Sequence, residues 1–206
     1  MRPGVSASTI IAARVHYSDY PEPRSIEIPY TADFSRWRLP EPRPNGQKYH
    51  QEPGTGVRLY YPPAFFHHNG TPLFGLLDAC AVLIEGEFKA LALLECGVYT
   101  IGLPGITTYL KNKETGIRQL LPDLQATLVQ ERIKHVYFLG DADTCTNYAF
   151  GRNAAFLANT VRPDGIKVYL PNLPLSGPKG IDDCKEKLGD GFGAFFTNVI
   201  KEAILL

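Results

Sequence analysis

Acidic residues follow two apolar segments of the chain, at the positions where buried strands are expected to end. Glu85 follows the run AVLI at residues 81–84, and Asp141 and Asp143 follow the run VYFL at residues 136–139. In an open parallel sheet the carboxyl ends of the strands converge on one crevice, so these three side chains are expected to meet there. Carboxylates in one crevice repel each other unless a divalent cation neutralises them, and oxygen ligands suit Mg²⁺, for which Mn²⁺ can substitute. The pattern indicates metal-assisted phosphate chemistry.

The elements that must position these acids begin near residue 78. From there strand-like and helix-like segments alternate, which is typical of a βαβ array. Strands are expected at 80–84, 98–101, 135–139 and 167–170, and helices near 87–96, 117–132, 147–161 and 190–205. The strand segments are continuously apolar, as in a sheet that helices cover on both faces. The sequence therefore predicts an α/β domain with a parallel sheet over residues 78–206.

Residues 1–77 have a different texture, with many turn formers and little helical periodicity. The segments PEPR, LPEPRPNGQ and EPGTG favour turns and loops over regular elements. Short extended pieces are expected at 25–28 and 57–61. We therefore predict a loop-rich N-terminal extension that contains short strands.

Basic and aromatic residues gather in this extension. The whole chain has 21 basic and 21 acidic residues and a formal net charge of zero, so nucleic-acid binding must depend on local patches. Trp37 and Tyr49 lie among arginines and lysines, a mixture that can stack bases and contact phosphates. The alternative is a set of solvated arginines over a segment whose aromatic residues pack onto the main domain. The candidate nucleic-acid contacts in this segment are Arg36, Arg38, Arg43 and Lys48.

Further candidates lie downstream of the acidic residues. Arg152, on the helix expected after Asp143, could contact a phosphate bidentately or face solvent. Lys179, in the segment GPKGIDDC, could also meet a phosphate. Asp182 or Asp183 in that segment could be a further metal ligand or could orient one, and Asp183 is the candidate ligand. Helix capping is the alternative role for these acids.

The cysteine spacing argues against a zinc-finger protein, and the hydropathy profile argues against a membrane-spanning one. The cysteines form no CxxC pair and have no histidine at zinc-finger spacing, so most are expected to be small buried residues. No apolar stretch approaches the length of a membrane span, and the N-terminus lacks a signal-peptide core. We therefore expect a cytoplasmic protein without a membrane partner.

The segment IEGEFKAL, followed by GDAD after an apolar strand, resembles the Toprim domain. This domain is shared by bacterial primases, topoisomerases, recombination-mediator proteins and a class of nucleases. The resemblance implies a parallel α/β sheet in which a glutamate ends the first strand and a DxD pair ends a later one. It further implies that Asp141 and Asp143 help to hold Mg²⁺, and that Glu85 acts as general acid/base or as a further metal ligand.

With KVYLPNLPLSGPKGIDDC included, the chain looks like the Toprim-like domain of primase and helicase proteins of phages, plasmids and integrated elements. That group often has an upstream segment with a lysine-tyrosine pair, here Lys48 and Tyr49, so the resemblance covers roughly residues 34–185. One departure is Lys89, which stands where bacterial primases usually have an acid. A lysine one helical turn from Glu85 could lower the pKa of that carboxyl or contact a phosphate, so Lys89 is a candidate catalytic residue.

These patterns and the resemblance lead to three hypotheses of function. The first is Mg²⁺-dependent nucleotidyl or phosphoryl transfer on nucleic acid, as the primase-type domain of a mobile-element DNA replication protein. Its partners would be single-stranded DNA or RNA, nucleotides and a replicative helicase. The second is a nuclease, because the same acids can direct water at a phosphodiester. The third is a non-catalytic module that binds single strands or assembles a replication complex.

Overall fold

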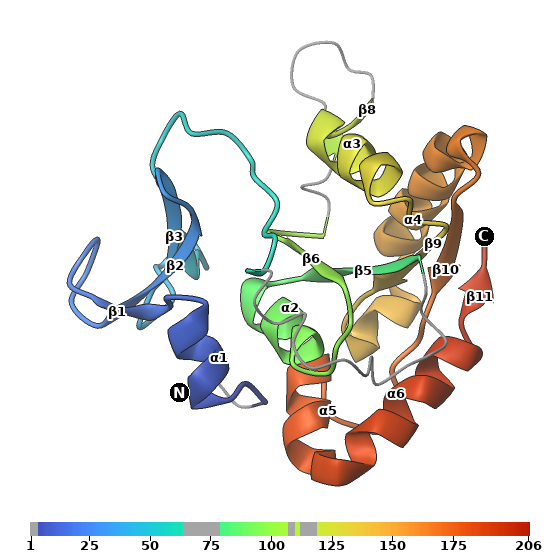
Figure 1. Ribbon diagram of the computed structural model, residues 1–206. Coiled ribbons are helices and arrows are strands. Elements are labelled where there is room, and N and C mark those ends of the chain that lie inside the picture. Colours follow the sequence, from blue (N-terminus) through green and yellow to red (C-terminus); the bar gives the residue numbers. More distant parts are fainter. Residues whose placement is uncertain (1–3, 64–78, 107–109, 112–118) are drawn as a thin grey trace.

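A five-stranded sheet lies at the centre of the computed structural model, which describes residues 4–63, 79–106, 110–111 and 119–206 (Figure 1). The strand order is β11-β10-β9-β5-β6. The strands are β5 (Cys80–Glu85), β6 (Thr100–Leu103), β9 (His135–Leu139), β10 (Lys167–Leu170) and β11 (Ile204–Leu205). All neighbours pair in parallel except β11, which joins β10 in the antiparallel direction at one edge. The predicted α/β class with a parallel sheet is confirmed.

Helices cover both faces of this sheet. Helices α2 (Glu87–Leu94), α5 (Ile181–Leu188) and α6 (Phe192–Lys201) contribute to the core on one face, and α3 (Pro122–Gln130) and α4 (Tyr148–Val161) contribute to the core on the other. Side chains along β5 alternate between the two cores, because successive residues of a strand point to opposite faces. Val82 and Ile84 pack under α2 and α6, while Ala81 and Leu83 pack under α3 and α4. This two-sided burial explains why the β5 segment is apolar at every position.

The C-terminal region holds two helices where the sequence analysis predicted one at 190–205. Gly189, with φ 49° and ψ −122°, separates α5 from α6. Acids Asp182 and Asp183 lie in the first turn of α5 and Lys185 and Lys187 in its last turn, an arrangement that suits the helix dipole. The hydrophobic pattern of α5 is short and mixed with charge, which is why periodicity detected only α6.

The N-terminal extension forms a sheet of its own rather than isolated strands. Its order is β1-β2-β3-β4, all antiparallel. The elements are α1 (Ala7–Ala12), β1 (His16–Ser18), β2 (Ser25–Thr31), β3 (Phe34–Arg38) and β4 (Tyr49–His50). The prediction of a strand near residues 25–28 is confirmed. The expectation of little helix is corrected by α1, which is capped by the Ser6 side chain accepting from the Thr9 backbone amide.

The strand predicted at 57–61 is replaced by a single β-bridge to the main sheet. Tyr60 and Gly102 of β6 exchange two backbone hydrogen bonds of 2.8 Å each. A Cβ atom at position 102 would lie 3.0 Å from the Cβ of Tyr60, so the glycine allows this close approach. Elsewhere β7 (Leu110–Lys111) and β8 (Gln119–Leu120) form a two-stranded ladder.

The extension is fastened to the main domain at its start as well. The Ser6 amide and hydroxyl both donate to Oε1 of Glu95, at 2.7 Å and 2.6 Å, and Lys185 of α5 donates to the other oxygen of Glu95. The carboxylate at the end of α2 thus joins the N-terminal segment to α5. The predicted domain boundary at residue 77 lies outside the described residues.

The hydropathy of the helices and the state of the cysteines bear on two further expectations. Among the described residues, no helix combines the length and the hydropathy needed to span a membrane. Cys80, Cys96 and Cys184 are buried free thiols and Cys145 is exposed, which confirms that most of the cysteines are small buried residues.

Candidate active site at the carboxyl edge of the sheet

Glu85 and Asp141 leave neighbouring parallel strands at the same edge of the sheet. Strands β5 and β9 pair with Ile84 opposite Leu139, so Glu85 is the last residue of β5 and Gly140 follows directly after β9. A Cβ atom at Gly140 would lie 2.2 Å from Oγ1 of Thr144, so the turn after β9 requires a glycine at this position. The short 3-10 helix η2 (Ala142–Thr146) follows and carries Asp143.

A cleft of about 430 Å³ lies between this edge and the N-terminal sheet. It brings together side chains from β3, β4, β5, α2 and the segment before α5. Most of the predicted site residues line it. The lining residues are Arg38, Lys48, Tyr49, Glu85, Gly86, Glu87, Phe88, Lys89, Pro104, Asp141, Lys179, Gly180 and Asp183.

Each acid of the DxD pair carries a lysine partner. The ammonium of Lys89 donates to Oδ1 of Asp141, and that of Lys179 lies 2.8 Å from Oδ2 of Asp143. The first pair is largely buried, with side chains 14% and 22% exposed, whereas the second is exposed to solvent. The hydrogen bond from Lys179 lowers the pKa of Asp143, and the same contact raises the pKa of Lys179.

Glu85 keeps access to solvent, yet the surrounding atoms desolvate its carboxyl group. This desolvation raises the pKa of Glu85, Lys89 and Lys179 oppose the rise, and the charges of Asp141 and Asp143 add to it. Lys89 acts in the direction that the sequence analysis predicted, but the desolvation outweighs it. A carboxyl with a raised pKa is suited to general acid or base chemistry.

The acids at this edge form a small donor set for Mg²⁺. Over the described ranges, no group of three or more His, Cys, Asp or Glu side chains is assembled closely enough to hold a metal ion. Mg²⁺ usually takes one or two protein carboxylates and completes its octahedral shell with water and substrate phosphates. Asp141 and Asp143, with Glu85 beside them, fit that mode once Lys89 and Lys179 give up their present partners.

Asp183 lines the cleft but already has a structural role. Its Oδ2 accepts a hydrogen bond from the Gly180 amide at 3.3 Å, so it takes part in capping α5. Metal binding by Asp183 stays a prediction.

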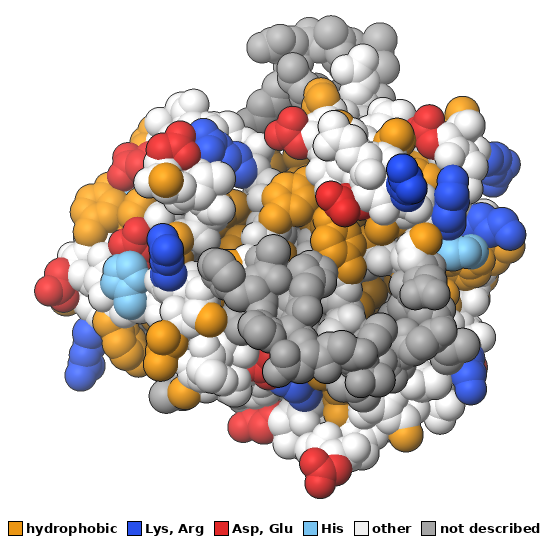
Figure 2. Space-filling view, in the orientation of Figure 1, with side chains coloured by type: hydrophobic (Ala, Val, Ile, Leu, Met, Phe, Trp, Pro, Cys, Tyr) orange, Lys and Arg blue, Asp and Glu red, His pale blue; other side chains and the backbone are white. Residues whose placement is uncertain are grey.

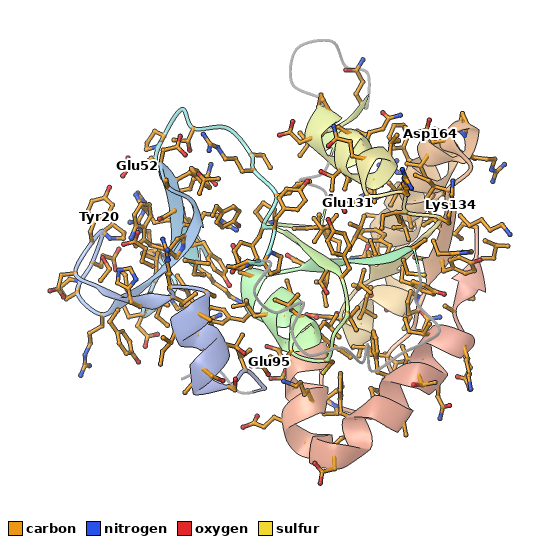
Figure 3. All side chains as sticks on the ribbon, viewed as in Figure 1. Tyr20, Glu52, Glu95, Glu131, Lys134 and Asp164 are labelled. Carbon is orange, nitrogen blue, oxygen red and sulfur yellow. The ribbon has the colours of Figure 1, made fainter. Side chains whose placement is uncertain are left out.

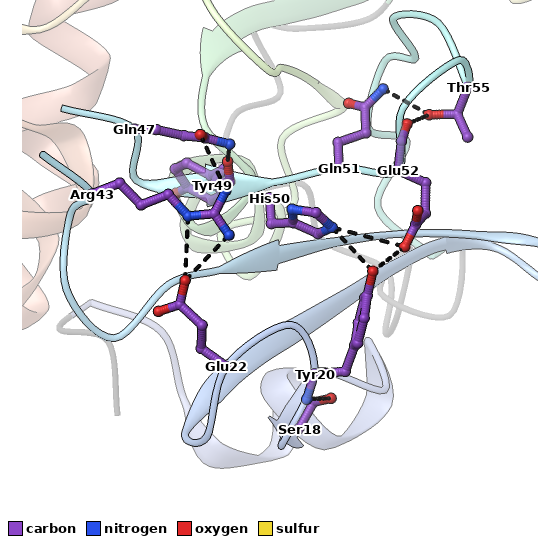
Figure 4. A network of polar contacts seen from close by, with 10 residues as sticks. All are labelled: Ser18, Tyr20, Glu22, Arg43, Gln47, Tyr49, His50, Gln51, Glu52 and Thr55. Carbon is purple, nitrogen blue, oxygen red and sulfur yellow. Dashed lines mark hydrogen bonds and ion pairs between the residues drawn. The ribbon is translucent and has the colours of Figure 1, made fainter. Parts of the chain in front are cut away.

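The predicted nucleic-acid contacts separate into two groups. Arg38 and Lys48 line the cleft, opposite the acidic edge. Arg43 lies on the surface of the extension, where Nε and Nη2 each lie 3.2 Å from Oε1 of Glu22 (Figure 4). Arg152 is exposed on α4 and does not line the cleft. On the face drawn in Figure 2, acidic and basic side chains are interspersed, and no area of one sign extends across it.

Arg36 does not belong to a nucleic-acid-binding surface, which corrects the prediction made for it. It is 7% exposed, and its Nη1 lies 2.5 Å from Oε1 of Glu87, which is 1% exposed. The hydroxyl of Tyr30 donates to the same oxygen at 2.7 Å. The guanidinium is therefore used to neutralise a buried carboxylate between the two sheets, where a nucleic acid cannot reach it.

This buried cluster is the part of the site region that sequence reasoning missed. Glu87 is the second acid of the segment IEGEF, where helix capping would account for it. In the described residues, Oε2 of Glu87, Nε of Arg36 and the hydroxyl of Tyr60 have no hydrogen-bond partner. A buried-looking acid at the start of a largely apolar helix was the available signal, but the partner of Glu87 lies 51 residues away.

A family model described as a domain of unknown function, DUF3854, matches residues 77–190. No curated protein matches the sequence. A crystal structure of the zinc-binding and RNA polymerase domains of the Aquifex aeolicus primase aligns with 99% of this chain and 51% of that one, at 16% identity and a TM-score of 0.56. The DnaG primase catalytic domain bound to ssDNA aligns with 96% of this chain and 58% of that one, at 18% identity and a TM-score of 0.58.

These structural alignments show a shared fold. The described chain has the mixed α/β architecture of primase catalytic domains, as the resemblance to the Toprim domain led us to expect. It spans about half the length of the first structure and 58% of the second.

Proposed function

The chain belongs to the DUF3854 family, and from its primase-like fold we propose that it is a Mg²⁺-dependent nucleotidyltransferase of the primase type. Its substrates would be nucleotides and single-stranded DNA or RNA, and it would act in the replication of a mobile element beside a replicative helicase. The observation that carries the proposal is the placement of Glu85 and Asp141 at the ends of adjacent parallel strands, in a cleft that Arg38 and Lys48 also line.

In this proposal two of the acids bind the metal ion and the third is the general base. Asp141 and Asp143 hold Mg²⁺, which when bound neutralises nucleotide phosphates and stabilises the charge that develops on them. Mn²⁺ would substitute for it. Glu85 accepts the proton of the attacking 3′-hydroxyl, since its raised pKa makes it a better base than an ordinary glutamate.

The basic residues of the cleft hold the negatively charged substrates in this proposal. Arg38 ends β3 and Lys48 directly precedes β4, and both would contact strand phosphates. Lys89 and Lys179 lie beside the acids and would contact nucleotide phosphates. Tyr49 also lines the cleft and offers an aromatic ring there, with the guanidinium of Arg36 4.7 Å from the ring centroid. Base stacking on such a ring is tolerant of sequence, as a primase requires.

A non-catalytic single-strand-binding module is the second candidate. The observation in its favour is that Lys89 and Lys179 already neutralise Asp141 and Asp143, so the cleft can receive a phosphate backbone without a metal ion.

The first test is incubation of the protein with single-stranded DNA, all four ribonucleotides and deoxyribonucleotides, and Mg²⁺ or Mn²⁺. Glu85→Gln removes the proposed base, and Glu131→Gln is a matched control at the opposite edge of the sheet (Figure 3). New or longer strands with wild type and Glu131→Gln, lost in Glu85→Gln, support the primase reaction. Shortened strands with the same dependence support a nuclease, and strand binding without products supports the binding module.

A further inference from the structure

We propose that Lys89 and Lys179 are resident counter-cations of Asp141 and Asp143, and that they make divalent-cation binding depend on a ligand that carries a polyphosphate group. This inference rests on the proposed function, because it concerns how the same acids receive their cation. The ligand class it names is a cation–polyphosphate complex, such as a nucleoside triphosphate with its metal ion. A free cation would be a poor ligand.

The position of Lys89 is built into the fold. Helix α2 is anchored on both sides of this residue, since Phe88 is 4% exposed and Ala90 is fully buried. The Lys89 side chain then passes the Gly180 backbone, where a Cβ atom would lie 3.0 Å from Cε of the lysine. The glycine leaves room for the lysine stem, which delivers the ammonium to Oδ1 of Asp141.

Lys179 is held beside the DxD segment by the main chain. The Ala142 amide, between the two acids, donates to the Lys179 carbonyl at 2.9 Å. This backbone contact does not depend on the side-chain pair, so Lys179 and Asp143 stay neighbours when their ion pair opens. The Lys179 side chain is 64% exposed, which leaves it free to turn toward an incoming phosphate.

Charge counting gives the consequence for a cation that arrives alone. Glu85, Asp141 and Asp143 carry three negative charges when ionised, and the two lysines carry two positive charges, so the group has a net charge of −1. A divalent cation is attracted far less strongly by this group than by the three acids without their lysines. The ammonium of Lys89 also occupies an oxygen of Asp141 that the cation would need, in a pair that is largely shielded from water.

A cation that arrives bound to a polyphosphate encounters a different balance of charges, because the polyphosphate offers the lysines new partners. The complex is anionic, so the lysines gain phosphate oxygens as partners when they leave the acids. A lysine ammonium is a flexible point charge that can exchange one oxygen partner for another. The two exchanges are coupled, because each lysine that moves to phosphate frees a carboxylate for the cation.

The test measures Mn²⁺ binding to the full chain by equilibrium dialysis, with bound Mn²⁺ read by electron paramagnetic resonance. The variants are Lys89→Met and Lys179→Met, with Lys134→Met as the control. Lys134 is an exposed lysine that immediately precedes β9, at the amino edge of the sheet (Figure 3). Each protein is titrated with Mn²⁺ alone and, separately, with a preformed Mn²⁺–tripolyphosphate complex.

We expect Lys89→Met to bind Mn²⁺ alone at least about tenfold more tightly than wild type, with a smaller gain for the exposed Lys179→Met. The preference of wild type for the complex over the free ion should fall by a similar factor in Lys89→Met, and Lys134→Met should behave as wild type. Asp141→Asn in the Lys89→Met background should abolish the gain, which ties it to this site.

Unchanged Mn²⁺ affinity in both lysine variants, with circular dichroism showing them folded, would overturn the inference. Because Lys179 is exposed, its variant keeps the test valid if Lys89→Met fails to fold. A shifted Mn²⁺ affinity without strand synthesis would count against the proposed function alone. Strand synthesis with an unshifted Mn²⁺ affinity would count against this inference alone.

Discussion

Arg36 on β3 and Glu87 on α2 form an ion pair of 2.5 Å in which both side chains are almost completely buried. The pair joins the N-terminal sheet to α2, the helix that begins at Glu87 and carries Lys89. Tyr30 donates to the same carboxylate, and burial together with the charge of Glu87 raises the pKa of Tyr30 far above its ordinary value. The wall of the cleft therefore depends on a contact between two parts of the chain that are distant in sequence.

Removing one member of this pair should be costly. We expect Glu87→Gln or Arg36→Met to lower the free energy of unfolding by about 3 kcal/mol, since each leaves an uncompensated buried charge or polar group. The double variant Arg36→Met/Glu87→Leu should recover most of this loss. Urea unfolding measures both. Arg43→Ala is the control, because its pair with Glu22 is partly exposed and should contribute at most about 1 kcal/mol. Equal losses for Arg43→Ala and Arg36→Met would show that burial does not set the energy.

Glu85→Gln should reduce strand synthesis by a factor on the order of 10²–10⁴, the usual contribution of a positioned general base. Its urea midpoint should stay close to that of wild type, because Glu85 lies at the solvent-accessible mouth of the cleft. As the pH is lowered, the activity of wild type should begin to fall at a pH above 4.5, the ordinary glutamate pKa. The reason is that the raised pKa of Glu85 leaves this base protonated there. Undiminished synthesis by Glu85→Gln would rule out this role.

The two groups of arginines and lysines should differ in their effect on single-strand binding. We expect Arg38→Ala and Lys48→Ala to weaken binding and to reduce the slope of log affinity against log salt by about 0.7 for each lost phosphate contact. Arg43 and Arg152 do not line the cleft, so Arg43→Ala and Arg152→Ala should leave this slope unchanged. Fluorescence anisotropy over a salt series measures this. A reduced slope in Arg43→Ala would mean that the strand runs over the outer surface of the extension.

Glu95 should make stability depend on pH in the acidic range. Burial alone would raise its pKa, but hydrogen bonds from Lys185 and Ser6 outweigh the burial and hold the pKa below the ordinary value of 4.5. A carboxyl with a depressed folded-state pKa stabilises the protein above its unfolded pKa, and this stability is lost as pH falls through the folded-state pKa. Urea midpoints measured downward from pH 6 should therefore fall more steeply for wild type than for Glu95→Gln below about 4.5. Parallel curves would contradict this assignment.

Two glycines should respond in opposite ways to alanine. At Gly102 an added Cβ would meet Tyr60 at 3.0 Å and Ala90 at 3.4 Å, so Gly102→Ala should destabilise by roughly 1–3 kcal/mol. At Gly151, inside α4, an added Cβ has nothing within 4 Å, so Gly151→Ala should stabilise by roughly 0.5–1 kcal/mol. Thermal unfolding compares the two. A stable Gly102→Ala protein would show that the bridge between Tyr60 and β6 can shift without cost.

Much of the main domain could be predicted because its signals are local. The apolar runs that became β5 and β9 are each followed by a glycine, Gly86 or Gly140, and Asn147 at the start of α4 accepts hydrogen bonds from the amides of Ala149 and Phe150. The extension gave weaker signals. The sequence of β3, FSRWR, does not alternate in polarity, so it carries no clear strand signal of its own. Its extended conformation depends on pairing with β2 and β4.

By itself the sequence determined the parallel α/β sheet and the arrival of Glu85, Asp141 and Asp143 at its carboxyl edge, because strand period and strand ends are set by neighbouring residues. Tertiary structure alone decided which charges pair. Lys89 is four residues from Glu85 yet pairs with Asp141, 52 residues away, and Arg36 is buried while Arg38, on the same face of β3, reaches the cleft. The physical reason is that an ion pair depends on distance and desolvation in space, and both are fixed only when the two sheets have packed together.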